Sequence, residues 1–234
     1  MKKSIVLLAI LLFPILVSAH GDWLEVKGSG KVGEPTKIQL VFGAYENQER
    51  VKGAKIAFLK DFTVYVMDAK GIKTTLEMTQ TETCFEGTFT PTSEGLFQII
   101  GINEVREVVD WTVHGFDVLR PTEYLRTQYV VEKSTENASE QGFLDVIPTK
   151  MNEDIKLTAF KNKGINPKAK LTITNPEGWE KIKFTDAKGE AIFKPNMKGM
   201  YMVEMEYLDK TAGNFKGKDY KMVRNKFSLM VMVE

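Results

Sequence analysis

FTPTSEGLF at residues 89–97 and FKPNMKGMY at residues 193–201 are the two stretches that decide the fold. Each contains an aromatic residue, then a proline, then a glycine, and ends on a second aromatic, with the same spacing. In a β-sandwich the first aromatic ends one strand, the proline interrupts pairing, the glycine makes the turn, and the second aromatic faces inward on the next strand. The recurrence predicts two copies of one β-sheet unit.

Short β-prone runs separated by Gly, Pro or Asp turns surround both stretches, as in an antiparallel sandwich. In the first half these runs are 23–26, 36–42, 62–67, 74–79, 85–89, 96–102 and 123–131. In the second half they are 143–147, 154–160, 170–173, 181–184, 191–193, 200–207 and 226–233. We therefore expect an all-β protein with two tandem immunoglobulin-like antiparallel β-sandwich domains, each of about 100 residues.

A polar stretch separates the two halves. Residues 134–141, STENASEQ, include no large apolar side chain and are typical of a linker between domains. The predicted organisation is a signal peptide at 1–19, a first sandwich at 20–133, this linker, and a second sandwich at 142–234.

The first 19 residues have the pattern of a secretory signal peptide. Lys2 and Lys3 precede an apolar run over 5–17, and Val17-Ser18-Ala19 supplies a small-residue cleavage site. The run is shorter than the roughly 20 apolar residues that a membrane-spanning helix needs. We expect cleavage after Ala19, export to the periplasm, and a mature protein that does not span the membrane and begins at His20.

The net charge argues against a nucleic-acid-binding protein, and the cysteine content argues against a reactive thiol. The chain has 32 basic and 31 acidic residues, and the predicted cleavage removes Lys2 and Lys3. A chain so close to neutrality lacks the basic excess that nucleic-acid binding requires, so we expect no nucleic-acid partner. Cys84 is the only cysteine and is interpreted as a buried, unreactive thiol.

The two histidines, His20 and His114, are the candidate metal ligands. A mature N-terminal His20 offers a metal its α-amine and its imidazole from one position, which an internal histidine cannot do. His114 can supply a third nitrogen, and Asp22 or Asp117 an oxygen. Such a borderline donor set suits nickel, cobalt, copper or zinc, with copper favoured by intrinsic affinity.

Five segments resemble an exported bacterial family called domain of unknown function 4198. They are HGDWLE at 20–25, KDFTVY at 60–65, DWTVHGFD at 110–117, TDAKG at 185–189 and EYLDKTAG at 206–213. The resemblance implies a two-domain, β-rich periplasmic protein that holds a divalent transition metal, nickel or cobalt, for a membrane transporter. The leading hypothesis is thus a metal-binding accessory protein for uptake or delivery, not an enzyme.

Two other functions stay open. An N-terminal histidine chelate with one further imidazole resembles the copper site of polysaccharide monooxygenases, with Trp23 and Trp111 as a substrate platform. Alternatively, the tandem sandwiches are a metal-free module that binds another envelope component, since fold alone does not specify function.

Methionines are concentrated near the C-terminus. Thioethers are soft ligands that select cuprous copper. Met200 and Met202 share one strand face by period two, whereas Met205 lies on the other. We interpret these methionines as adaptable core-filling residues.

Overall fold

The computed structural model describes residues 20–45, 49–135 and 137–234, with the backbone alone at His20 and His114. The predicted signal peptide, residues 1–19, lies outside the described residues. Strands make up 57% of the described residues and helix 6%, and the strands form packed sheets that are almost entirely antiparallel. The prediction of an all-β antiparallel sandwich fold is confirmed.

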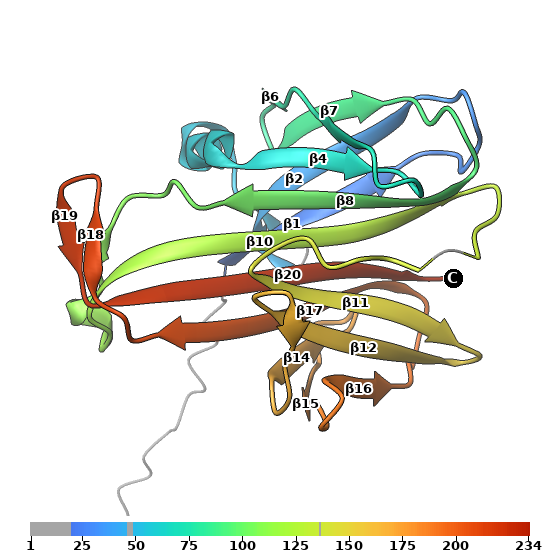
Figure 1. Cartoon of the computed structure of the whole chain (residues 1–234). Coiled ribbons are helices and arrows are strands. Elements are labelled where there is room, and N and C mark those ends of the chain that lie inside the picture. Colours follow the sequence, from blue (N-terminus) through green and yellow to red (C-terminus); the bar gives the residue numbers. More distant parts are fainter. Residues whose placement is uncertain (1–19, 46–48, 136) are drawn as a thin grey trace, which may run out of the picture.

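A long central sheet of nine strands runs through the whole molecule (Figure 1). Its main path is β15 (Glu180–Phe184), β14 (Lys170–Thr174), β17 (Gly199–Asp209), β20 (Met222–Val233), β10 (Val118–Val131), β8 (Gly95–Asn103), β4 (Thr63–Met67) and β5 (Lys73–Thr75). The short strand β9 (Val109–Asp110) pairs with the start of β10. All pairings in this sheet are antiparallel except one: β10 and β20 run parallel.

Two smaller sheets cover the central sheet. The first outer sheet contains β1 (His20–Lys27), β2 (Thr36–Ala44), β3 (Glu49–Arg50), β6 (Thr79–Gln80) and β7 (Phe85–Phe89). The second outer sheet contains β11 (Leu144–Met151), β12 (Asp154–Lys161), β13 (Gly164–Ile165) and β16 (Glu190–Phe193). The remaining elements are the hairpin β18 (Gly213–Phe215) and β19 (Lys218–Tyr220) and the 3₁₀ helices η2 (Gly53–Asp61) and η3 (Thr112–His114).

The recurring sequence stretches occupy equivalent places in the two halves. Each carries the chain from an outer sheet into the central sheet, from β7 to β8 and from β16 to β17. The ring centroids of Phe89 and Phe97 lie 5.5 Å apart, and those of Phe193 and Tyr201 lie 5.6 Å apart. The intervening glycines have φ values of 126° and 128°, which strain any residue with a side chain. The repeat predicted from the sequence is therefore a structural repeat.

The two copies meet at the parallel pair of β10 and β20. In the first copy the central strands follow the order β5-β4-β8-β10, and in the second β15-β14-β17-β20. Successive side chains on a strand point to opposite faces. Leu125 of β10 lies in the core beneath the first outer sheet, whereas its neighbour Tyr124 lies in the core beneath the second. The outer sheets thus cover opposite faces of one shared sheet, as Figure 1 shows.

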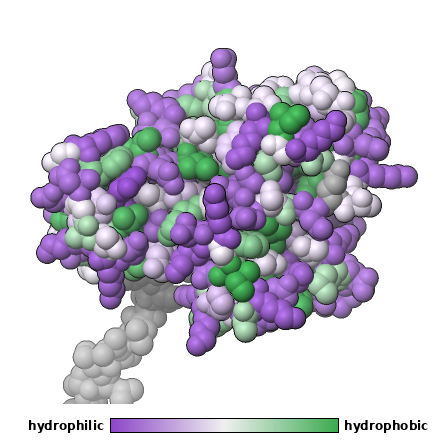
Figure 2. All heavy atoms as spheres, viewed as in Figure 1, coloured by the Kyte–Doolittle hydropathy of each residue, from purple (hydrophilic) through white to green (hydrophobic). Residues whose placement is uncertain are grey.

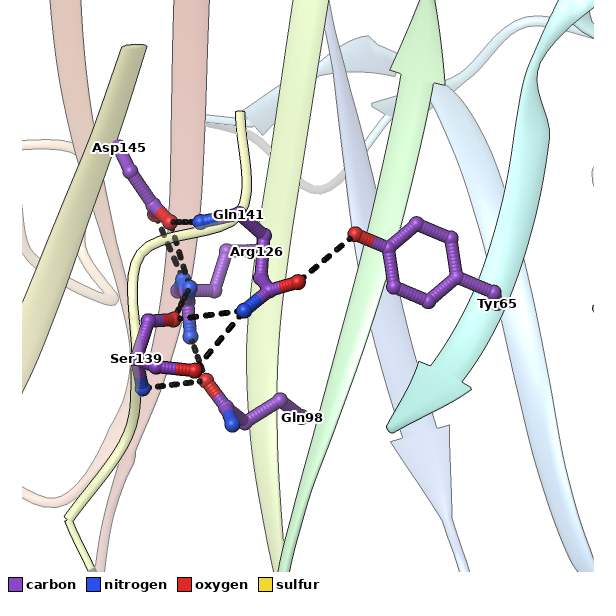
Figure 3. Close-up of polar contacts among 6 residues, drawn as sticks. All are labelled: Tyr65, Gln98, Arg126, Ser139, Gln141 and Asp145. Atoms are coloured by element: carbon purple, nitrogen blue, oxygen red, sulfur yellow. Dashed lines mark hydrogen bonds and ion pairs between the residues drawn. The ribbon is translucent and has the colours of Figure 1, made fainter. Parts of the chain in front are cut away.

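Figure 3 shows a buried polar network at the segment that was predicted as a linker. Arg126 of β10 is fully buried, and its Nε donates to Asp145 Oδ1 of β11 at 2.6 Å. Its Nη1 donates to Gln98 Oε1 at 2.7 Å, and its Nη2 to the Ser139 carbonyl at 2.8 Å. The Gln141 N–H donates to Asp145 Oδ2 at 2.7 Å. The end of the segment is therefore fastened to both halves, and the two-domain division stays a prediction.

Within the described ranges, no helix has the length and apolar character to cross a bilayer. The face drawn in Figure 2 is mostly hydrophilic, and its hydrophobic residues form small separate patches.

Candidate functional site

Two of the three predicted metal ligands can be placed only by their backbone. His20 is the first residue of β1 and pairs with Ala44 of β2. His114 is the last residue of η3, in the connection between β9 and β10. Both imidazoles lie outside the described part of the structure, so their predicted convergence stays a prediction. Among the described residues, no three His, Cys, Asp or Glu side chains come together as a metal site.

Asp22, the third predicted ligand, lies in a buried cluster of charged residues. It follows His20 by two positions in β1 and is 5% exposed. Its carboxyl group lies beside that of Glu123 of β10, and the two can be hydrogen-bonded only when one of them carries a proton. Glu123 is paired in register with Lys226 of the parallel strand β20. The start of β1 is thereby set against the seam between the two copies.

The other members of the cluster pair with one another. Arg106 Nη1, from the loop after β8, donates to Glu123 Oε1 at 2.7 Å. Lys226 Nζ lies 3.0 Å from Glu204 Oε1 of β17. An ideal Cβ built on Gly21 would lie 3.3 Å from Lys226 Nζ, so a larger residue there would crowd the cluster.

Burial and the carboxylate excess determine how these groups titrate. Burial, and next the neighbouring Glu123 carboxylate, raise the pKa of Asp22 well above its ordinary value. Burial disfavours the charged form of Lys226, but the Glu204 carboxylate outweighs it and raises the pKa of Lys226. Lys226 therefore stays charged while Asp22 tends to hold a proton.

Three polar atoms in and beside this cluster are buried without a hydrogen-bond partner. They are Asp22 Oδ1, Glu123 Oε2 and Asn103 Nδ2. Asn103 is paired in register with Glu123 across β8 and β10. Orphaned buried acceptors are costly, and they are usual where an ion or a ligand completes the site. Two orphaned carboxylate oxygens near the start of β1 fit a cation.

The excess of acidic over basic groups in this cluster also favours binding of a cation. Among the described residues, Asp22, Glu123 and Glu204 face Arg106 and Lys226, while the nearby Arg224 is paired with Glu206. A proton on Asp22 balances the third carboxylate, and a bound cation would do the same in its place.

Sequence reasoning identified Asp22 but missed its partners. Glu123 and Lys226 stand at the starts of predicted strands, but only the parallel pairing of β10 with β20 puts them side by side. Asp117, the other predicted oxygen donor, accepts a hydrogen bond from the Val118 N–H at 2.9 Å. Trp23, suggested as a surface platform, is 1% exposed, and its Nε1 donates to Glu25 Oε1. The platform interpretation is therefore wrong for Trp23.

Comparison with known proteins identifies no family and no function for the chain. No family model and no curated protein matches the chain. A solved structure of native α-2-macroglobulin from Escherichia coli, spanning domains MG0-NIE-MG1, is 8% identical, with 91% of this chain and 97% of that chain covered and a TM-score of 0.25. The group B streptococcus pilus 2b backbone protein is 10% identical, with 88% and 97% covered and a TM-score of 0.16. We infer neither a shared topology nor a shared function from such low scores.

Proposed function

We propose that the protein is a periplasmic accessory protein that binds a divalent transition metal, nickel, cobalt or copper, at the start of β1. The proposed ligands are the amine and imidazole of His20, the imidazole of His114, and the carboxylate of Asp22. The resemblance to domain of unknown function 4198 supports delivery of this metal to a membrane transporter.

The observation that carries the proposal is the orphaned carboxyl pair. Asp22 Oδ1 and Glu123 Oε2 are buried and accept no hydrogen bond from a donor of the described residues, and the nearby basic groups Arg106 and Lys226 are already paired. A cation stabilises such oxygens strongly, because the free-energy cost of removing them from water has already been incurred during folding. Asp22 is only two positions after His20, so one metal ion can use both residues.

Metal binding should displace the proton that Asp22 holds. The raised pKa of Asp22 means that the carboxyl group is protonated more readily than an ordinary aspartate. Coordination requires the deprotonated carboxylate, and binding therefore releases the proton. The proposal thus predicts a proton count as well as an affinity.

The decisive experiment is calorimetric titration of Ni²⁺ and Cu²⁺ into protein that begins at His20, compared with protein carrying one additional N-terminal glycine. The added residue turns the His20 amine into an amide, and we expect affinity to fall by about tenfold or more. Equal affinities would contradict the proposed chelate.

A second comparison isolates the carboxyl pair. Titrations in two buffers of different ionisation enthalpy give the number of protons released, which should be lower in Asp22→Asn than in the unmodified chain. Glu94→Gln is the matched control, because it also removes one negative charge, from an exposed position in the turn before β8. Identical proton counts for all three proteins would exclude Asp22 as a ligand.

A further inference from the structure

A groove opens in the central sheet where β10 and β20 separate. Their parallel pairing ends at Thr127 and Met230, after which β10 continues along β8 and β20 continues along β17. Figure 1 shows the two strands diverging toward the C-terminal end of β20. The groove between them has a volume of about 1000 Å³. Its wall includes the methionines Met197, Met200, Met230 and Met232.

Four methionines form a two-by-two array on one face of β17 and β20. Met200 is directly opposite Met232, and Met202 is directly opposite Met230. Opposite residues of an antiparallel pair have Cβ atoms about 4.5–5.5 Å apart. Residues two apart on one strand share a face. The backbone register therefore directs all four thioethers to the same side of the sheet.

The array passes from the core of the protein into the groove. Met202 and Met230 are buried, at 2% and 4% exposure, in a cluster with Cys84 and Trp23. Met200 is partly buried and packs against the same cluster, whereas Met232 is 61% exposed. The Tyr45 hydroxyl donates a hydrogen bond to the Met200 carbonyl, which holds this part of β17 in place.

Core filling explains only part of this arrangement. Adaptable methionines are good fillers for the buried space around Met202 and Met230. That reason does not apply to Met232, which is 61% exposed, and it applies only in part to Met200, which packs against the buried cluster and also lines the groove. Thioether sulfur is a soft ligand without a proton to lose, and it selects soft monovalent ions such as Cu⁺.

We propose that Met200, Met202, Met230 and Met232 form a binding site for a soft monovalent metal ion, Cu⁺ or its analogue Ag⁺. The ion enters from the groove, where it meets Met200 and Met232 first, and the buried pair completes the thioether set. The long, unbranched methionine side chains have three rotatable bonds each, so they can reorient toward one ion. No change of oxidation state is involved.

Charged groups in the groove are balanced, so sulfur is the distinctive feature. Carboxylates are present at Glu25, Glu153, Asp154 and Glu234, and amines at Lys150, Lys194 and Lys198. Glu25 is held by Arg50 at 2.7 Å to both oxygens, and Glu153 is paired with Lys194. These pairs leave little net charge to attract hard ions in preference to soft ones.

The test is anaerobic competition for Cu⁺ against a chromophoric bicinchoninate complex, with calorimetry of Ag⁺ binding alongside. Met200→Leu/Met232→Leu keeps the apolar volume and removes the two entry sulfurs. We expect its dissociation constant for both ions to rise by more than about tenfold. The matched control is Met205→Leu/Met151→Leu, which replaces one buried and one exposed methionine outside the array. Equal effects of the two double variants would overturn the site.

A measurement without substitutions uses methionine labelled with ¹³C at the ε-methyl group. Addition of Ag⁺ should shift the resonances of the four array methionines and leave Met67 and Met205 unshifted. If the array resonances do not move at saturating Ag⁺, or if Cys84→Ser alone abolishes binding, the proposal is wrong.

This site is independent of the metal site proposed at the start of β1. An added N-terminal glycine removes the His20 amine but no sulfur, so Cu⁺ and Ag⁺ affinity should be unchanged. Loss of Ag⁺ binding in the extended protein would show that the N-terminal nitrogen holds the ion, which contradicts the thioether site.

Discussion

The two copies of the repeat carry different side chains at equivalent positions of the central sheet. In the second copy, Met200 and Met202 of β17 face Met232 and Met230 of β20. The matching positions in the first copy are Leu96 and Gln98 of β8, opposite Val130 and Gln128 of β10. Each set lies on the face turned away from its own outer sheet.

These two sets of residues occupy equivalent positions with different chemistry. We call the first-copy set the polar surface, because it contains Gln98 and Gln128, and the second-copy set of four methionines the sulfur surface. On the first copy, Gln98 joins the network of Arg126 and Asp145, in which donors and acceptors have fixed partners. On the second copy, the methionines pack with Trp23 and Cys84 without such partners. Directional bonds fix one geometry, whereas thioethers adapt to their neighbours. The polar surface is therefore suited to locking the copies together, and the sulfur surface to accepting a ligand.

The largest effect is expected when the polar surface is broken. Arg126→Met leaves the Asp145 carboxylate buried without its guanidinium, which should lower the free energy of unfolding by about 3–5 kcal/mol. Met202→Leu on the sulfur surface should cost less than about 1.5 kcal/mol, because volume and polarity are nearly conserved. Urea denaturation of both variants measures the contrast.

Two further variants test whether the loss comes from the unpaired charge. Arg126→Met/Asp145→Leu should recover part of the stability that Arg126→Met loses. Lys194→Ala, which breaks an exposed ion pair with Glu153, should change stability by less than about 1 kcal/mol. Equal losses for Arg126→Met and Met202→Leu would remove the distinction between the surfaces.

The two proposed metal sites should differ in their response to acid. The α-amine and imidazole of His20 have ordinary pKa values of about 7.7–8.0 and 6.5, so protons compete for both nitrogens. Ni²⁺ affinity should fall by about a hundredfold or more between pH 7 and pH 5. Ag⁺ affinity should change by less than about threefold, because thioethers do not titrate. Calorimetry across this range measures both, and parallel losses would contradict separate sites.

A smaller effect is expected at the buried carboxyl pair. Because the folded pKa of Asp22 is raised, its stabilising contribution is complete below the unfolded pKa of about 3.9 and is lost as pH rises through the folded pKa. Asp22→Asn cannot ionise and can donate permanently to Glu123. At pH 7 it should raise the free energy of unfolding, with the difference vanishing near pH 4. An Asn variant that is less stable at neutral pH would show that Asp22 is charged in the fold.

The smallest effect concerns reactivity within the sulfur surface. Dilute peroxide should oxidise Met232 first and Met200 next, because Met232 is exposed and Met200 only partly buried, while the buried Met202 and Met230 stay protected. Peptide mass spectrometry of timed samples gives the order, and Ag⁺ should slow oxidation of the first two. Simultaneous oxidation of all four would mean that the array is not graded from core to groove.

The repeated fold could be predicted from the sequence because its signals are local. The proline, glycine and flanking aromatics of 89–97 and 193–201 encode a turn between two sheets, and each copy contains all of them. The parallel pairing of β10 with β20 could not be predicted. It joins residues about a hundred positions apart, and it does not change the alternation of apolar and polar residues along either strand.

For the two candidate sites, the sequence predicted only the residues that lie close together on a single strand. Asp22 was found because it stands beside His20, whereas Glu123 and Arg106 reach it through the folded chain. The shared face of Met200 and Met202 follows from period two, but the positions of Met230 and Met232 opposite them depend on strand register. Two methionines spaced two apart on each of two strands were the available signal for the array.

The parallel seam also determines how the molecule can move. Tandem sandwiches commonly rotate about a hinge, yet rotation here would have to tear the ladder that runs from Leu119 and Met222 to Thr127 and Met230. The part of the groove wall that β10 and β20 form therefore cannot open by rotation of one copy against the other.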